Sequence, residues 1–368
     1  MKNTAKTLLF LSIVALLSAC NSSAVTLSNL SSKGQDVRHT EAQLTYLNSD
    51  NYLDTTPYNG NMSVSAPNPV VLSWEASGNA KSYKVNIYKD ADLSDLVVSY
   101  TSNEKSLDFY NSELGTTYYW NVSSGNVTSE SATFTTDSKG PRNLYVEGVE
   151  NFRDLGGYGN IKQGLIYRSG RFNEDKEDIK VSITDKGLFE INNVLNIKTE
   201  IDLRRTSTNE VGGLTDKSVL GDGVNYIQLP MYYGGNNILT FTGKASGDDF
   251  TYDNPAKIKS FFEILADANN YPVNFHCSIG KDRTGCLAFL IEALLGNSEE
   301  QLFRDYMFTN FANAGMCKST DLSTKYFKTL SDYEDGDTFQ EKTYNYLHTV
   351  IGITEENLNS VIALLKAE

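Results

Sequence analysis

The sequence predicts two folded parts, an all-β sandwich followed by an α/β domain with a mostly parallel central sheet flanked by helices. Three observations predict this division. Short stretches of alternating apolar residues follow one another over residues 49–138, and strand-like segments alternate with helical ones over residues 142–368. Between them, Ser138-Lys139-Gly140-Pro141 has the composition of a boundary. At 368 residues the chain is long enough for both cores.

The amino terminus has the pattern of an export signal. Lys2 and Lys6 precede an apolar run over residues 8–17, which is too short for a stable membrane-spanning helix. Small residues before Cys20 resemble a bacterial lipoprotein cleavage site. We therefore expect a signal peptide over residues 1–19, lipidation of Cys20, and anchoring to the bacterial cell membrane or outer membrane. The alternative is an ordinary secretory signal.

Residues 20–48 are rich in Ser and Asn and show little periodicity, which predicts a flexible tether. The sandwich is predicted from five short strands that are separated by Gly, Asn and Asp turns and include no helix. Those strands cover residues 70–74, 82–88, 96–100, 117–122 and 131–135.

The aromatic residues of these strands are placed as in a fibronectin type III module, which the region resembles. We expect Trp74, Tyr83 and the Tyr118-Tyr119-Trp120 cluster to fill the core of the sandwich. The alternative is that they form a platform for a protein or glycan ligand.

The α/β domain is predicted from alternating elements, and in such folds ligands bind at the carboxyl ends of the strands. We expect Asn254 to cap one helix, with Pro255 at its first position. Strands are expected over residues 198–204, 224–231 and 271–275, and helices over residues 182–196, 254–268, 282–295, 298–312, 321–332 and 354–366.

Charge excludes one large class of partner. The chain has 32 basic and 46 acidic residues, a net charge of −14, and no basic run. Nucleic-acid binding relies on a basic field, so we expect no nucleic-acid partner. A site for phosphate must then be local, built from backbone dipoles and one or two cations.

The most informative segment runs from His276 to Gly285, where a cysteine is followed six positions later by an arginine. Thiol-based phosphate-ester hydrolysis needs a thiolate, which forms where positive potential is concentrated. The loop Ser278-Ile279-Gly280-Lys281-Asp282 can curl its N–H groups around phosphate, and Arg283 adds a two-pronged donor. An apolar helix follows, whose positive N-terminus would abut the loop.

These residues resemble the signature loop of the cysteine-dependent protein tyrosine and dual-specificity phosphatases. Three other segments match a bacterial branch of that family, and together the resemblance covers about the last 60% of the chain. The matching segments begin at Asn151, Leu165 and Asp305, and read Asn-Phe-Arg-Asp-Leu-Gly-Gly, Leu-Ile-Tyr-Arg-Ser-Gly and Asp-Tyr-Met-Phe-Thr-Asn.

The resemblance implies roles for the loop. Cys277 attacks phosphorus and forms a cysteinyl-phosphate, and Arg283 clamps the equatorial oxygens. Thr284 can donate a hydrogen bond to the sulfur, while His276 and Gly285 order the loop. No metal or other cofactor is expected, since His276 and Cys277 are adjacent and no second pair stands at ligand spacing.

The general acid has three candidates. Asp282 is the usual one in the resembling branch, although it could instead be a helix-capping carboxylate whose pKa the neighbouring Arg283 lowers. Asp248 lies in a Gly- and Asp-rich segment with the composition of a lid, 29 positions before Cys277, where many tyrosine phosphatases carry their acid on a mobile loop. Asp253 is the third candidate.

The expected substrates are phosphate monoesters, with phosphotyrosine first and phosphoserine or phosphothreonine next. Lys281 could meet a second phosphate, which makes a phosphoinositide or inositol phosphate the alternative, or it could only add positive potential. A second alternative is a non-catalytic binding protein for phosphate or glycan. Outside the loop, Arg153 with Asp154, and Arg168 with Arg171, are expected to form structural ion pairs or helix-end contacts.

Overall fold

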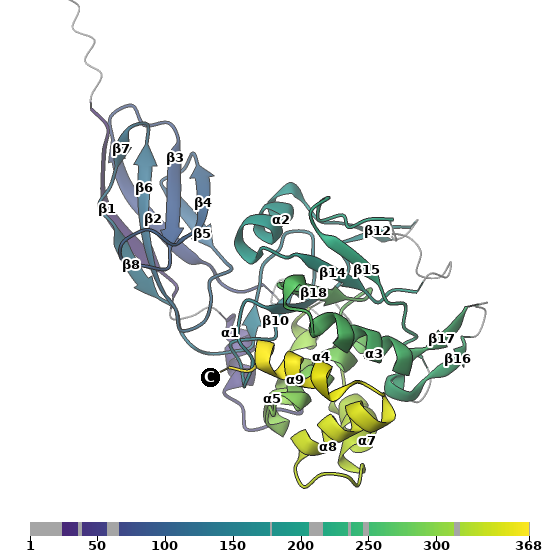
Figure 1. Cartoon of the computed structure of the whole chain (residues 1–368). Helices are drawn as coiled ribbons and strands as arrows, with labels where there is room; N and C mark the ends of the chain where they lie inside the picture. Colours follow the sequence, from purple (N-terminus) through teal and green to yellow (C-terminus); the bar gives the residue numbers. More distant parts are fainter. Residues whose placement is uncertain are drawn as a thin grey trace, which may run out of the picture.

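The computed structural model describes residues 24–35, 39–56, 66–176, 179–205, 216–234, 237–245, 250–312 and 317–367. Two parts are visible in Figure 1, an N-terminal β region and a larger region in which helices surround a central sheet. The expected signal peptide and Cys20 lie outside the described residues.

The central sheet is mostly parallel, as the sequence predicts. Its strand order is β15-β14-β18-β11-β10-β9. The first four strands run parallel to one another, and β10 pairs antiparallel with both β11 and β9. The strands are β9 (Arg142–Asn143), β10 (Arg153–Asp154), β11 (Ile166–Ser169), β14 (Thr199–Asp202), β15 (Asn225–Gln228) and β18 (Val273–His276). Because β18 is central, its carboxyl end is enclosed by strands on both sides.

Helix α4 is buried from Arg283 to Leu294, and α5 is buried from Leu302 to Phe308, whereas α3 and α9 bury only one face. The continuous apolar sequence of α4 explains why it lies between the sheet and the other helices. The helices are α2 (Asp185–Glu190), α3 (Asn254–Leu265), α4 (Asp282–Leu294), α5 (Glu299–Phe308), α6 (Ser319–Asp321), α7 (Lys328–Ser331), α8 (Phe339–Asn345) and α9 (Glu355–Leu365), with π turns at Ile191–Leu195, Leu322–Phe327 and Tyr346–Val350.

The N-terminal β region consists of two antiparallel sheets that share one core. Of the expected core residues, Trp74, Tyr83, Tyr118 and Trp120 are buried in it, but Tyr119 is only half-buried, because neighbouring residues of a strand point to opposite faces. One sheet has the order β1-β2-β5, and the other has the order β4-β3-β6-β7 with β8 also paired to β6. The strands are β1 (Thr26–Lys33), β2 (Val70–Ser77), β3 (Tyr83–Tyr88), β4 (Leu96–Ser102), β5 (Ser106–Phe109), β6 (Thr117–Ser124), β7 (Val127–Thr128) and β8 (Ala132–Thr135).

The tether predicted over residues 20–48 is wrong for most of its length. Thr26–Lys33 forms strand β1, which pairs with β2. Glu41–Leu47 forms helix α1, which Thr40 and Gln43 cap reciprocally. Figure 1 shows α1 (purple) beside the helices of the larger region and away from the N-terminal sheets. The polar composition hid one strand and one capped helix, because both bury only a few side chains.

We call residues 39–56 the strap, because this segment leaves the N-terminal β region and lies along helix α5. The Arg304 guanidinium donates to the carbonyls of Tyr46 and Ser49, both at 2.8 Å. It also lies over the Tyr46 ring, with 5.2 Å to the ring centroid. The Tyr46 ring packs in turn on Phe308 and Phe311. The strap is therefore part of the core beneath α5.

Three further features differ from the sequence expectations. Two hairpins were not predicted, β12 (Asn173–Lys176) with β13 (Ile179–Ser182), and β16 (Thr242–Lys244) with β17 (Thr251–Asp253). Helix α3 is capped by Asp253 and not by Asn254.

Within the part of the chain that the structure describes, none of the helices combines the length and apolar composition needed to cross a lipid bilayer.

Candidate active site

The loop between β18 and α4 lies at the carboxyl end of the central strand. Cys277 follows β18 directly and is buried, and Arg283 is in the first turn of α4. Strand β18 is buried along its whole length and flanked by strands on both sides, so it fixes where the loop begins, and the buried helix fixes where it ends. Cys277 and Arg283 thus share one loop, as the sequence predicts.

Two glycines make this loop possible. Gly280 has φ +70, and a Cβ there would lie 2.5 Å from the carbonyl oxygen of Ser169. A side chain at this position is excluded twice, by conformation and by space. At Gly285 a Cβ would lie 3.1 Å from the Tyr306 ring, so the glycine lets α4 approach α5 closely.

A buried ion-pair network lies beneath the loop. Asp305 of α5 accepts hydrogen bonds from both Arg153 and Arg168. Arg168 also donates to the carbonyl of Gly280 at 2.7 Å, and Asn151 donates to the carbonyl of Ile279 at 3.0 Å. The two arginines therefore connect α5 to the middle of the loop and fix the orientation of its carbonyls.

The structural ion pairs expected for these residues are present, but Arg153 and Asp154 do not pair with each other. Arg153 pairs with Asp305, and Asp154 pairs instead with Arg142. Arg171 pairs with Glu174 and also donates to the carbonyl of Ser278 at 2.8 Å. The reason is geometric, because neighbouring residues of a strand point to opposite faces of a sheet.

His276 is held between two groups at the base of the loop. One ring nitrogen lies 2.9 Å from a Glu200 oxygen, and the other lies 3.3 Å from the carbonyl oxygen of Cys277. Both contacts hold the ring at the base of the loop, and the loop-ordering role stays a prediction.

Glu200, Asp202 and His276 form the one group among the described residues that has metal-ligand composition and spacing. Each carboxylate is already satisfied by protein donors. Asp202 accepts hydrogen bonds from the Arg204 guanidinium and the Tyr226 hydroxyl. Glu200 accepts a hydrogen bond from the Ser218 hydroxyl and is also hydrogen-bonded to the His276 ring. Burial opposes ionisation of Asp202, but the charges of His276 and Arg204 lower its pKa to about 2. An arginine on the carboxylate fits an ion pair better than a metal site.

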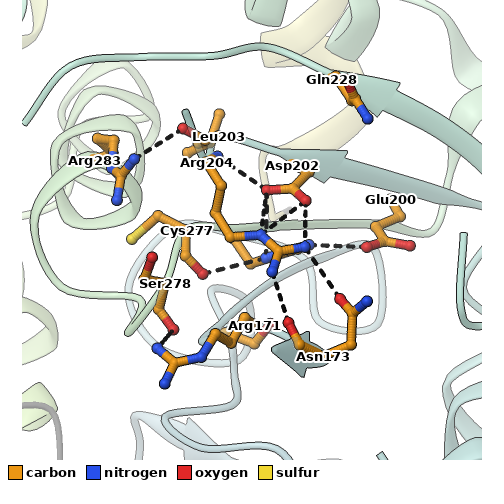
Figure 2. A network of polar contacts seen from close by, with 12 residues as sticks. Arg171, Asn173, Glu200, Asp202, Leu203, Arg204, Gln228, Cys277, Ser278 and Arg283 are labelled. Carbon is orange, nitrogen blue, oxygen red and sulfur yellow. Dashed lines mark hydrogen bonds and ion pairs between the residues drawn. The ribbon is translucent and has the colours of Figure 1, made fainter. Parts of the chain in front are cut away.

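Arg283 is oriented by the loops that follow β14 and β15. Its Nη1 lies 3.1 Å from the carbonyl oxygen of Leu203 and 3.4 Å from that of Met231. Its guanidinium carbon lies 4.9 Å from the ring centroid of Tyr233. Figure 2 shows Arg283 reaching the Leu203 carbonyl on the same side of the network as Cys277. Main-chain carbonyls therefore hold one edge of the guanidinium before any substrate arrives.

The three candidates for the general acid have separate outcomes. Asp282 is the first residue of α4 and is not its cap. Burial raises the pKa of its carboxyl, against the opposing charges of Lys281 and Arg283. Asp253 is exposed, and its carboxylate accepts from the Ala256 N–H as the cap of α3. Asp248 lies outside the described residues.

The remaining loop residues line the same site. The Thr284 hydroxyl is buried and has no hydrogen-bond partner in the described part of the chain, so the expected bond to the Cys277 sulfur is not present. Lys281, Ser278 and Ile279 are half-buried at the surface of the loop. Lys281 precedes α4 as its N-cap residue.

A sequence profile described as "Tyrosine phosphatase family" matches residues 144–368. The chain belongs to this family. Among curated proteins it is 24% identical over 193 residues to the protein of Cupriavidus necator named "Putative tyrosine-protein phosphatase". That match covers 48% of this chain and 66% of the relative, slightly less than two thirds of the relative's own length.

Two solved structures match about half of the chain at low similarity. The core catalytic domain of the PP-IP phosphatase SIW14 from S. cerevisiae is 20% identical, with a TM-score of 0.31, and the match covers 49% of this chain and 85% of that one. TpbA of P. aeruginosa, in complex with pTyr, is 17% identical with a TM-score of 0.30, and the match covers 50% and 91%.

Sequence reasoning missed two contributors to the candidate site. Tyr233 contacts the guanidinium of Arg283, although it lies 50 positions before it in a segment without a recognisable motif. Asp305 was recognised only as part of a matching segment, and its pairing with two distant arginines gave no local signal. The adjacent aromatic residues at positions 232 and 233 were the only available hint.

Proposed function

We propose that the chain is a metal-independent protein tyrosine phosphatase with dual specificity, which hydrolyses phosphate monoesters through a cysteinyl-phosphate intermediate. One observation carries the proposal. Cys277 and Arg283 lie at the two ends of one loop, and the Arg283 guanidinium is already oriented by the carbonyls of Leu203 and Met231. Orientation before binding is what electrostatic stabilisation of a transition state requires.

The first step forms a bond between the Cys277 sulfur and phosphorus and breaks the bond from phosphorus to the leaving oxygen. Asp282 gives that oxygen a proton, and the raised pKa keeps this carboxyl protonated to higher pH than an exposed aspartate. Arg283 binds the equatorial oxygens as their charge spreads.

In the second step water attacks phosphorus and the cysteine sulfur leaves as a thiolate. Asp282, now ionised, accepts a proton from the water. The buried hydroxyl of Thr284 can turn toward the departing sulfur, because no other described group holds it. Inorganic phosphate and the free enzyme are the products.

The experiment is hydrolysis of p-nitrophenyl phosphate by the full chain, with a chelator and a reductant present, beside Cys277→Ser. The wild-type chain should turn over, while the variant should bind phosphate without turnover. The full chain is needed because the strap belongs to the core under α5. Absence of turnover by a folded wild-type chain would contradict the proposal and favour a non-catalytic binding protein.

We also propose that the protein is exported and anchored through a lipid on Cys20, and that the N-terminal β region is a fibronectin type III-like sandwich. The signal-like sequence before Cys20 supports the first. Two antiparallel sheets with Trp74 and Trp120 in their shared core support the second. Labelling with a radioactive fatty acid tests the anchor, since Cys20→Ser should abolish incorporation.

A further inference from the structure

A buried amide connects the strap to the segment that follows α5. Asn310 lies in the 3-10 turn Thr309–Phe311 and is fully buried. Its Oδ1 accepts from the N–H of Cys317 at 2.6 Å, and its Nδ2 donates to the Cys317 carbonyl at 3.0 Å. The same Nδ2 donates to the hydroxyl of Thr55, a buried residue near the end of the strap. Both hydrogens of the Asn310 amide are thus used, one on each segment.

Cys317 begins a helical segment that packs on α4. We call residues 317–327 the rim segment, which contains α6 and the π turn Leu322–Phe327. The centroid of the Tyr326 ring in this turn lies 6.1 Å from that of the Phe289 ring of α4. The rim segment therefore lies against the helix that begins at Asp282.

The charges of the rim segment act on the Asp282 carboxyl. Burial raises the pKa of this carboxyl most, and the neighbouring cations Lys281 and Arg283 oppose the rise. Asp321 of α6 adds to the rise, and Lys325, which pairs with Asp321 at 3.7 Å, opposes it. The rim segment thus supplies part of the environment that keeps this carboxyl protonated.

The other titratable groups that face Asp282 stay uncharged while it titrates. These groups are Tyr306 of α5 and, in the rim segment, Cys317 and Tyr326. Burial raises the pKa of all three, that of Cys317 to about 12. A change in the titration of Asp282 therefore reports on its burial and on the four charges named above.

Hydrogen bonds carry much of the contact between the strap and the rim segment. Residues of both, among them Thr55 and Ser319, line one cavity of about 290 Å³. Side chains lose van der Waals contact across such a space. Thr55 also lies outside residues 144–368, the part that the family profile matches. The bond between Thr55 and Asn310 is therefore supplied to the matched part from outside it.

We propose that Thr55 is a positioning residue for the reaction, because through Asn310 it holds the rim segment against the helix that carries Asp282. The proposal rests on the proposed function, in which Asp282 is the general acid. Loss of the Thr55 hydroxyl leaves one hydrogen of a buried amide without its acceptor, so the amide moves to find another. Because the same amide holds both main-chain groups of Cys317, the rim segment moves with it.

Variants of two adjacent threonines test this proposal in the full chain. Thr55→Val removes the hydroxyl and keeps the shape of the side chain, and Thr55→Ser returns the hydroxyl. Thr56→Val is the matched control, because Thr56 is exposed and its hydroxyl donates to Asp54. For each chain, kcat and KM for a phosphotyrosine peptide are measured across pH. The titration of Asp282 is followed separately by NMR of carbon-13-labelled aspartate, assigned with Asp282→Asn.

We expect Thr55→Val to lower kcat about threefold to tenfold and to change KM less than about twofold, since the phosphate loop keeps its contacts. The decline of kcat at high pH and the titration of Asp282 should both move to lower pH. The reason is that Asp282 becomes less buried and loses the effect of Asp321. Thr55→Ser should recover the wild-type profile, and Thr56→Val should match wild type within about twofold.

A merely structural threonine gives a different result. If Thr55→Val lowers the urea midpoint but keeps the pH profile and the Asp282 titration of wild type, the proposal is overturned. If Thr55→Val does not fold, Thr55→Ala takes its place, because it removes the hydroxyl without setting a methyl group against the amide. The same shift to lower pH is then expected.

The titration also separates this proposal from the proposed function. A wild-type chain that never hydrolyses the peptide contradicts the proposed function, and a shifted Asp282 titration in Thr55→Val still shows that the strap positions this carboxyl. A wild-type chain that hydrolyses the peptide, with equal pH profiles and titrations in both chains, keeps the function and excludes the positioning role.

Discussion

Asp305 beneath the phosphate loop is buried, Glu190 at the junction with the N-terminal β region is half-buried, and the two carboxyl groups have opposite surroundings. Asp305 meets two arginines, whose charges lower its pKa although burial opposes this. Glu190 meets the Tyr100 hydroxyl at 2.9 Å and the Asn111 amide at 2.6 Å, and burial raises its pKa. Asp305 is the more deeply buried and yet has the lowered pKa, so the charge of the partners decides the direction of the shift.

The difference separates two uses of a carboxyl group. Under the loop, the charged Asp305 carboxylate accepts strong hydrogen bonds from both Arg153 and Arg168 and so holds the two arginines in place. At the junction only neutral donors contact Glu190. The two parts are joined there by packing, such as the Tyr100 ring on the Phe189 ring at 5.3 Å, and by hydrogen bonds from Arg142 to the carbonyls of Asn111 and Ser112.

Removal of the Asp305 charge should have the largest effect. Asp305→Asn leaves two buried arginines short of a carboxylate, and we expect a loss of about 3–5 kcal/mol in the free energy of unfolding. Urea unfolding measures it. Because the pKa of Asp305 is lowered in the folded chain, its contribution is complete above the usual aspartate pKa and is lost as pH falls.

A matched control for that variant is Asp332→Asn, which breaks an exposed pair with Lys328 on α7. Exposed pairs contribute little, so its urea midpoint should stay that of wild type. A loss below about 1 kcal/mol for Asp305→Asn would mean that the arginines under the loop find other acceptors.

Asp282 offers an intermediate case, since its carboxyl is largely buried beside cations and yet its pKa is raised. We expect Asp282→Asn to lower kcat for a phosphotyrosine peptide about 100-fold or more. Wild-type kcat should fall as pH rises through the raised pKa, because the acid is lost by deprotonation.

The pH dependence of kcat tests whether Asp282 is the general acid. In Asp282→Asn that decline at high pH should be absent, and p-nitrophenyl phosphate should suffer less than the peptide, since its leaving group needs a proton less. A variant that keeps the decline would assign the acid to another residue, with Asp248 the next to replace.

The smallest effect is expected at the junction. The folded chain holds the Glu190 proton above pH 4.5, the usual value, where the unfolded chain has lost it. Wild-type stability should therefore decrease as pH rises from 4.5 through the raised pKa. Glu190→Gln should remove that decrease and change stability by about 1 kcal/mol or less. Urea unfolding curves between pH 4.5 and 8 measure the stability of both chains. If wild type and Glu190→Gln showed the same pH dependence, Glu190 would not be the group responsible.

The sequence predicted what local pattern encodes. A cysteine loop between an apolar strand and an apolar helix required only neighbouring residues, so Cys277, Arg283 and the parallel sheet were placed correctly. The partners of Arg153 could not be found in this way, because Asp305 lies 152 positions away and reaches it only through folding.

The strap was missed for a different reason. Its sequence is polar, and helix α1 gains its place from a few contacts, mainly Tyr46 against Phe308 and Phe311. Most residues of the strap are polar, so its overall composition does not reveal the few side chains that are buried. Tyr233 was missed because a single aromatic residue has no period that a pattern could detect.

The path of the strap also determines what a protease can release. The chain passes between the two parts three times, before α1, after α1 and between β8 and β9. A cut between β8 and β9, near Lys139, leaves the hydrogen bonds from Arg304 to the strap intact, so we expect the two fragments to stay associated. If Cys20 carries the proposed lipid anchor, release of the larger part from the membrane requires a cut before Thr26, and the whole molecule then leaves in one piece.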